Sequence, residues 1–139
     1  MKLIFFISTI LFVQFAYGQK TLHLYGGENQ DVYLGCLNCS DIDRNSIWND
    51  IGTYGSNISS KSIWNDIGTY GSDLSRYSPF NSIASNPPAI MDKDGNFYGY
   101  LTSNDIKSNK ADFKLALTIC KYYKEIQKDV SGWYKKIFN

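Results

Sequence analysis

Histidine is the scarcest functional residue in this chain of 139 residues, because His23 is the only one. A Ser–His–Asp hydrolase would need that histidine, and no G-x-S-x-G motif stands near it. The acidic residues lie in polar, turn-like stretches, where carboxylates are more often solvated caps than catalytic pairs. The sequence therefore favours a non-enzymatic protein over a hydrolase.

The chain also lacks a surplus of charge, since residues 19–139 carry 13 basic and 13 acidic side chains. Nucleic-acid binding proteins usually carry a strong basic excess, so no nucleic-acid partner is expected. The charges are unevenly placed, however. Residues 19–106 carry 5 basic and 10 acidic groups, whereas residues 107–139 carry 8 basic and 3 acidic groups. We expect the acidic body and the basic tail to pack on each other.

Long apolar runs are missing except near the start, where Leu3–Val13 reads LIFFISTILFV. That run is too short to span a bilayer, and Lys2 before it and the small residues AYG after it are typical of a secretory signal peptide. We expect residues 1–18 to be removed by cleavage near Gly18. The remainder, 19–139, is then a single exported domain without a transmembrane segment, secreted or periplasmic.

Cysteine is sparse and odd in number, with Cys36, Cys39 and Cys120. An exported chain meets an oxidising compartment, so a disulfide is the first expectation. The short C-L-N-C loop favours the pair Cys36–Cys39. Cys120 lies in an apolar helical pattern and is expected to be a buried, unpaired side chain.

Two other chemistries remain open for these residues. His23, Cys36, Cys39 and Cys120 are the minimum set for a Cys₃His zinc site. The C-x-x-C spacing also occurs in thiol oxidoreductases, although the long helix that usually follows is missing here. A small metal- or thiol-dependent enzyme is therefore the alternative function. No other cofactor is expected.

An eleven-residue segment, SIWNDIGTYGS, occurs twice, at residues 46–56 and 62–72. A degraded copy, SPFNSIAS, begins sixteen residues later at Ser78. Repeats of this length need neighbours or another layer to bury their apolar faces. The repeat array is assigned to residues 43–86.

The third copy indicates how each repeat folds. Pro79 follows Ser78, and proline after serine is typical of the first turn of a helix. Gly52 and Gly68 then stand where a short helix ends. The array is therefore predicted to consist of short helical turns capped by glycine.

Hairpins are predicted on both sides of the array. DVYLGCLNCSDI at residues 31–42 resembles GNFYGYLTSNDI at residues 95–106, and each follows a polar turn and a strand-like run. The hairpins are assigned to residues 19–42 and 87–106.

Apolar residues from Phe113 to Ile137 recur at helical spacing, which predicts an amphipathic helix within 107–139 that Ser131–Gly132 breaks near its end. The fold class is α+β: a small antiparallel sheet of two β-hairpins, the array of turns, and the C-terminal helix.

Aromatic residues recur in the array, some expected in the core and others expected at the surface. Trp48, Trp64 and Phe80 occupy matching positions, and a chain this short needs them in its core. Tyr54 and Tyr70 lie in the turns and are the candidate ligand-binding residues, since exposed tyrosines suit sugar rings and protein surfaces.

The stretches YLGCLNCSDID, NSIWNDIGTYGS, YSPFNSIASNPP and DGNFYGYLTSN resemble a group of small exported bacterial proteins with tandem S-I-x-N-x-[YI]-G-x-Y-G-S repeats between Y-L-G-x-L hairpins. Members often carry an aromatic residue where this chain has Ile51, Ile67 and Ile83. No activity is established for the group. The sequence thus predicts a binding or structural module of the cell envelope or exterior, with a glycan or surface protein as partner.

Overall fold

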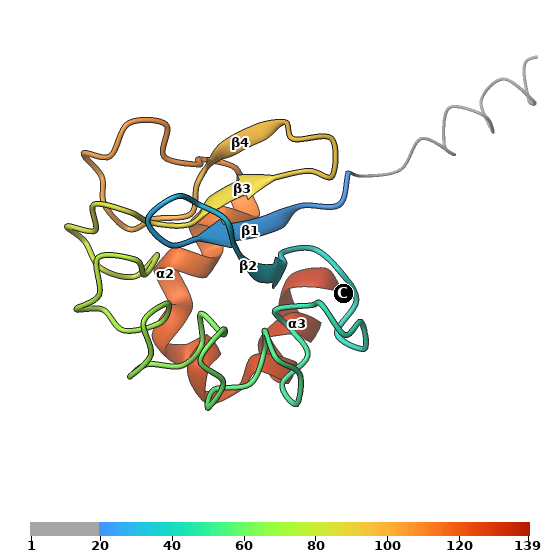
Figure 1. The fold of residues 1–139 in the computed structure, drawn as a ribbon. Helices are drawn as coiled ribbons and strands as arrows, with labels where there is room; N and C mark the ends of the chain where they lie inside the picture. Colours follow the sequence, from blue (N-terminus) through green and yellow to red (C-terminus); the bar gives the residue numbers. More distant parts are fainter. Residues whose placement is uncertain (1–19) are drawn as a thin grey trace, which may run out of the picture.

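The computed structural model describes residues 20–139, so the predicted signal peptide lies outside the described residues. The described chain begins with the strands β1 (His23–Gly26) and β2 (Val32–Cys36) and continues through the array to β3 (Ala89–Met91) and β4 (Phe97–Tyr100). Two helices follow, α2 (Lys114–Lys128) and α3 (Val130–Phe138). Figure 1 shows the turns of the array curving around the two helices, with the sheet beside them.

The four strands form one antiparallel sheet in the order β2-β1-β3-β4. Leu24 of β1 lies opposite Ile90 of β3, and both side chains are fully buried. The sheet is central to the core because these facing aliphatic side chains meet the array and the helices. The α+β class and the small antiparallel sheet are confirmed, whereas two helices stand where one C-terminal helix was predicted.

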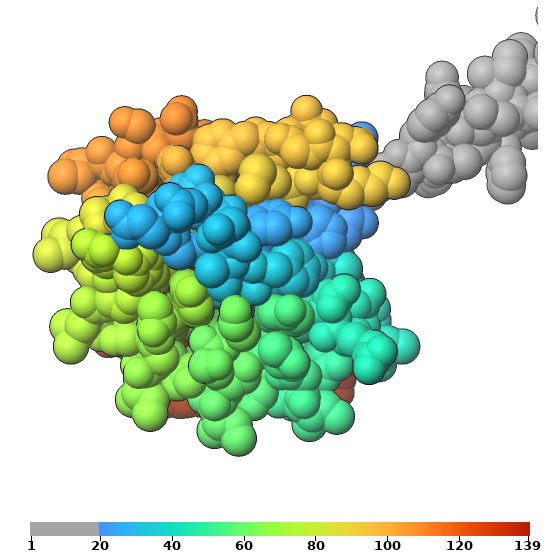
Figure 2. Space-filling model, in the orientation of Figure 1, coloured from blue at the N-terminus to red at the C-terminus, as the bar shows by residue number. Residues whose placement is uncertain are grey.

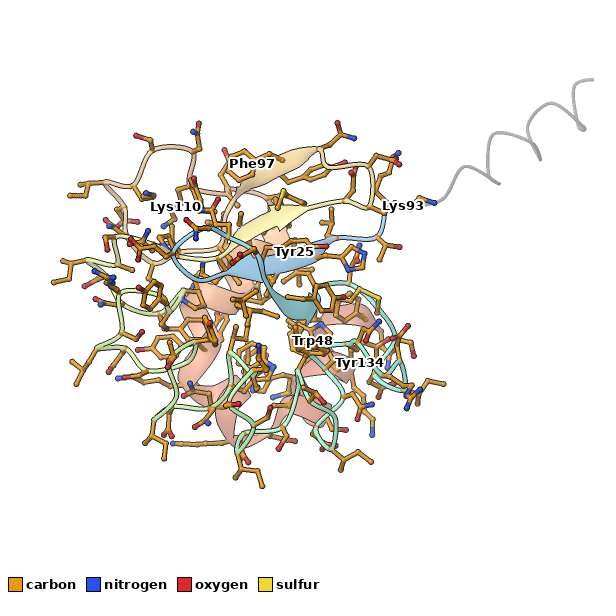
Figure 3. The ribbon with its side chains drawn as sticks, in the orientation of Figure 1. Tyr25, Trp48, Lys93, Phe97, Lys110 and Tyr134 are labelled. Carbon is orange, nitrogen blue, oxygen red and sulfur yellow. A yellow bond between two sulfur atoms is a disulfide. The ribbon has the colours of Figure 1, made fainter. Side chains whose placement is uncertain are left out.

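The array is built on an aromatic ladder. The ring centroids of Trp48 and Trp64 are 5.5 Å apart, those of Trp64 and Phe80 are 5.9 Å apart, and Phe80 stacks on Tyr123 of α2 at 4.4 Å. Each of the three array rings is at most 3% exposed, which confirms that they form core. Figure 3 shows Trp48 close to Tyr134 of α3, and their centroids are 6.2 Å apart. The ladder therefore ties the array to both helices.

Residues 43–86 form consecutive turns, whereas short helices were predicted. Their backbone hydrogen bonds close over three residues, as from the Asn49 amide to Ser46 and from the Gly52 amide to Asn49. The side-chain oxygen of Asn49 accepts the Ile51 amide, and that of Asn65 accepts the Ile67 amide. Such local side-chain bonds compete with helix propagation, so the turns cannot extend into helices.

The asparagine side chains also link successive turns. The Nδ2 groups of Asn49, Asn65 and Asn81 donate to the carbonyl oxygens of Asp43, Ser59 and Ser75 at 3.1–3.2 Å. Each bond spans six residues. A single asparagine thus hydrogen-bonds backbone groups on both sides of a turn. These bonds fix the shape of the array, although it has no regular secondary structure.

The C-terminal segment is two helices, not one interrupted near its end. Asp129 separates α2 from α3 with φ −155° and ψ 73°, and its Oδ1 accepts the Gly132 amide at 3.0 Å. The break comes before the predicted Ser131–Gly132 because an aspartate cap starts a new helix there. Neither helix has the length and apolar character that crossing a bilayer requires, among the residues described.

Asp92 organises the turn between β3 and β4. Its carboxylate accepts the Asn96 side chain at 2.9 Å, the amides of Asn96 and Asp94, and the Tyr98 hydroxyl at 2.8 Å. Hydrogen bonds from the Asn96 side chain, with those from backbone amides and Tyr98, hold the pKa of this carboxyl well below its usual range. The turn is therefore tied to one ionised side chain.

We expect Asp92 to contribute stability only where it is ionised. Because its folded pKa is depressed, the contribution is full above the unfolded pKa, about 3.9, and is lost as pH falls through the lower folded value. The melting temperature of an Asp92→Asn variant should therefore lie below that of the wild type at pH 7 and approach it as pH falls below about 4. A difference that is constant across this range would contradict the assignment. The exposed neighbour Asp94 supplies the control Asp94→Asn.

Candidate functional site

Tyr54 and Tyr70 are half-buried and lie against the β1–β2 pair. The Tyr54 ring meets the Tyr33 ring edge-on, with centroids 5.1 Å apart. A Cβ atom on Gly26 would stand 3.3 Å from the Tyr70 ring, so that ring covers the end of β1. Both tyrosines thus contribute to the packing of the array on the sheet. Their role in ligand binding stays a prediction.

The structure brings together only one pair of the four predicted zinc ligands. Cys36 and Cys39 form a disulfide, which confirms the predicted pairing. His23 lies opposite Cys36 in the β1–β2 register, but its Nδ1 pairs with the Tyr33 hydroxyl at 2.8 Å. Cys120 lies on α2. Among residues 20–139, no group of three or more His, Cys, Asp or Glu side chains is arranged to hold a metal ion.

The environment of Cys120 is unfavourable for thiol chemistry. Burial raises the pKa of the Cys120 thiol to about 11, so it is protonated at neutral pH. Burial lowers the pKa of His23, against the opposing effect of Asp43 and Asp92, and raises that of Tyr33 to about 12. This part of the chain therefore offers a neutral hydrogen-bonded pair and an inert thiol.

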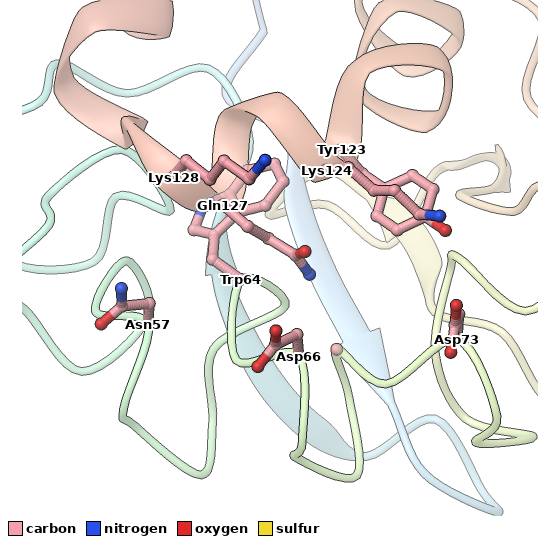
Figure 4. Close-up of a pocket in the computed structure, with 9 residues that line it drawn as sticks. Asn57, Trp64, Asp66, Asp73, Tyr123, Lys124, Gln127 and Lys128 are labelled. Carbon is pink, nitrogen blue, oxygen red and sulfur yellow. The ribbon is translucent and has the colours of Figure 1, made fainter.

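A groove opens between the array and α2 (Figure 4), with a volume of about 470 Å³. Clefts that bind small ligands typically enclose about 300–1,000 Å³. The array contributes one wall and α2 the other. The lining residues are Asn57, Trp64, Asp66, Gly71, Asp73, Tyr123, Lys124, Gln127 and Lys128.

The two walls of the groove carry opposite charge. Asp66 and Asp73 stand on turns of the array, and Figure 4 shows Lys124 and Lys128 across from them on α2. Neither lysine is within 4.0 Å of a carboxylate in the part of the chain that the structure describes. A ligand in the groove therefore meets hydrogen-bond acceptors on one side and donors on the other.

Tyr123 and Gln127 lie between the charged walls. The Tyr123 ring is fixed by stacking on Phe80, with the two rings only 4° from parallel. The Nε2 group of Gln127 is buried and has no hydrogen-bond partner in the structure. A buried donor without a partner costs about 1–3 kcal/mol. Trp64 also lines the groove, but its side chain is fully buried. Its indole Nε1–H donates a hydrogen bond to the Ile47 carbonyl oxygen.

Seven turns, six along residues 40–83 and one beyond β4, carry a bare aliphatic side chain, a feature that the sequence analysis missed. These side chains, here called the tips, are 79–91% exposed. The tips are Ile42, Ile51, Ile58, Ile67, Leu74, Ile83 and, beyond β4, Ile106. Figure 2 shows the turns that carry them as protrusions from the molecular surface.

The seven tips share one local hydrogen bond. The backbone amide of each tip donates to the side-chain oxygen of a serine or asparagine two residues earlier, at 3.1–3.4 Å. The sequence signal of a tip is therefore S-x-[IL] or N-x-I, whereas S-x-W and S-x-F at residues 46–48, 62–64 and 78–80 mark buried side chains. It escaped the sequence analysis because an aliphatic residue in a repeat is normally expected in the core.

No protein-family model, curated protein or solved structure matches the chain. Function must therefore be argued from the geometry of the groove and of the tips.

Proposed function

We propose that the chain is a non-enzymatic binding module of the cell envelope or exterior that holds a glycan in the groove between the array and α2. The proposal is carried by the unpartnered Nε2 donor of Gln127 at the wall of that groove. Sugar hydroxyls both donate and accept hydrogen bonds, so they complement the carboxylates of Asp66 and Asp73 as well as the ammonium groups of Lys124 and Lys128.

Tyr123 supports the same class of ligand. Its ring is held parallel to Phe80 and cannot turn away, so it presents a preorganised apolar edge to a ring-shaped ligand. Protein sites that bind small molecules commonly combine one such aromatic surface with a few converging polar groups. The Cys36–Cys39 disulfide supports an oxidising location, as the expected export signal implies.

Binding is tested by titrating the purified chain with soluble oligosaccharides and by retention on insoluble cell-wall polysaccharide. A groove variant carrying Asp66→Asn and Gln127→Leu should lose at least about tenfold in affinity, because each change removes a charge-assisted or otherwise unmet hydrogen bond. Asp50→Asn is the matched control, since Asp50 holds the same place in the preceding repeat but does not line the groove.

The proposal fails if the wild type binds no glycan, or if the groove variant binds as well as the control. A third variant, Tyr54→Ala with Tyr70→Ala, tests the tyrosines of the turns. Loss of binding there, with normal melting, would move the site from the groove to the face of the β1–β2 pair.

A further inference from the structure

The tips differ from ordinary exposed aliphatic residues because five of the seven follow an aspartate directly. The pairs are Asp41–Ile42, Asp50–Ile51, Asp66–Ile67, Asp73–Leu74 and Asp105–Ile106. Single exposed aliphatic residues are common, but a regular series of nearly bare ones indicates an interaction surface. Each of these tips offers an apolar knob with a carboxylate at its base.

A surface of the opposite character lies on α2. Leu117 is 44% exposed, and Lys114 and Lys121 stand three and four residues away on the same helix face. A cavity of about 480 Å³ opens there, lined by Asp112, Lys114, Leu117, Thr118, Lys121 and Tyr122. This hollow, named after Leu117, has an apolar floor between two lysines and one acidic residue, Asp112, at its margin.

Most charged groups of both surfaces have no ion-pair partner among residues 20–139, although Asp105 pairs with Lys110 and the Lys121 ammonium lies over the Tyr122 ring. Only three side-chain ion pairs occur within residues 20–139: Lys20–Asp94, Arg76–Glu28 and Lys110–Asp105. The acidic body and the basic tail were expected to pack on each other, and their contact is mainly aromatic, through Phe80 and Tyr123 and through Trp48 and Tyr134. The array side thus keeps its acidic excess and the helices keep their basic excess.

We propose that a second copy of the chain binds at the Leu117 hollow. An Asp-preceded tip of one copy is inserted into the hollow of the next. The aliphatic side chain would cover Leu117, while the preceding aspartate would meet Lys114 or Lys121. The two surfaces belong to different elements, so the contact is heterologous and continues from copy to copy into a ring or a filament. Contact between two rows of tips is disfavoured because it would bring aspartates together.

Self-association would also serve the proposed glycan binding, although it does not depend on it. Linking several weak sites raises overall avidity by about 10²–10⁴ without any new contact to the ligand. An exported module with one small groove gains most from such linkage. The two proposals can fail separately, since one is read by glycan affinity and the other by molecular mass.

The first measurement is sedimentation equilibrium of the exported chain over a range of concentrations. We expect reversible association that weakens at least about tenfold when NaCl is raised from about 0.05 M to about 0.5 M, because salt screens the lysine–aspartate pairs. A chain that stays monomeric at low salt and millimolar concentration would overturn the proposal. Association that salt strengthens would also overturn it, since that result indicates tip-to-tip contact.

A mixing experiment tests the two halves of the contact. The tip variant carries Asn in place of all five Asp-preceded tips: Ile42→Asn, Ile51→Asn, Ile67→Asn, Leu74→Asn and Ile106→Asn. The hollow variant carries Leu117→Asp. Each variant alone should be monomeric, whereas an equal mixture should form a one-to-one dimer through the intact hollow of one and the intact tips of the other. Failure of the mixture to associate would overturn a heterologous contact.

Matched controls separate the loss of a specific tip–hollow contact from a general change in the polarity or charge of the protein surface. Ile58→Asn with Ile83→Asn removes two tips that follow Asn57 and Ser82 instead of aspartate, so association should fall much less. Lys93→Gln removes an exposed lysine at the β3–β4 turn and should have no effect, while Lys114→Gln with Lys121→Gln should weaken association at least about tenfold. All these side chains are exposed, so every variant should melt as the wild type does.

Discussion

Replacing Gly71 by alanine should destabilise the protein by at least about 3 kcal/mol, because a methyl group there meets backbone on two sides. A Cβ at Gly71 would overlap the carbonyl oxygen of Asn65 and lie 2.6 Å from that of Ile63. Neither atom can move alone, since Asn65 anchors its turn through both its amide side chain and its backbone. Relief would require the whole repeat to shift.

Gly68→Ala is the matched control in the same repeat. A Cβ there would approach only the Asn65 side chain, at 3.0 Å from Nδ2. Because that neighbour is a side chain, we expect a change within about 1 kcal/mol. Urea denaturation followed by far-ultraviolet circular dichroism measures both variants. Equal stabilities for Gly71→Ala and Gly68→Ala would show that the turns are looser than their hydrogen bonds indicate.

This contrast also shows what the repeated sequence specifies. Gly68 was expected to matter as a helix end and Gly71 was not singled out, yet the array contains no helix. Gly71 is needed because the chain folds back against the backbone of its own turn. The distinction between the two positions depends on where the turn places Asn65, which spacing alone does not reveal.

Much of the core could be predicted from the sequence, because the same aromatic position recurs in three repeats. Trp48, Trp64 and Phe80 recur at the sixteen-residue spacing of units that are too short to bury a face of their own. The strands could be found for a similar reason, since Leu24, Leu34 and Ile90 are apolar, strand-forming residues flanked by polar turns.

The surfaces that carry the proposals could not be predicted in the same way. The groove depends on the distance between the array and α2, and nothing local to Asp66 or Gln127 indicates that they face one cavity. The break at Asp129 was misplaced because Ser131–Gly132 resembles a stronger stop than an aspartate. The tips were missed because burial is the usual fate of isoleucine, and the local turn does not distinguish them, since the amides of the buried Trp48, Trp64 and Phe80 make the same hydrogen bond.

The aromatic ladder leads to the second large expected effect, on replacing Trp64 by alanine. Trp64 is fully buried between Trp48 and Phe80, and its Nε1 donates to the Ile47 carbonyl at 2.6 Å. Truncating a buried aromatic residue costs about 3–5 kcal/mol, from lost burial and the cavity that remains. Because domains of this size are stable by only about 5–15 kcal/mol, the variant should be close to unfolding at room temperature.

Ile67→Ala is the control, three residues away in the same repeat. Ile67 is 90% exposed, so its truncation removes no core and should change stability by less than about 0.5 kcal/mol. Trp64→Phe keeps an aromatic ring and loses the indole donor, so its stability should fall between those of the wild type and Trp64→Ala. If Trp64→Ala costs less than about 1 kcal/mol, the ladder does not hold the array to α2, and the groove would lose the fixed wall on which glycan binding depends.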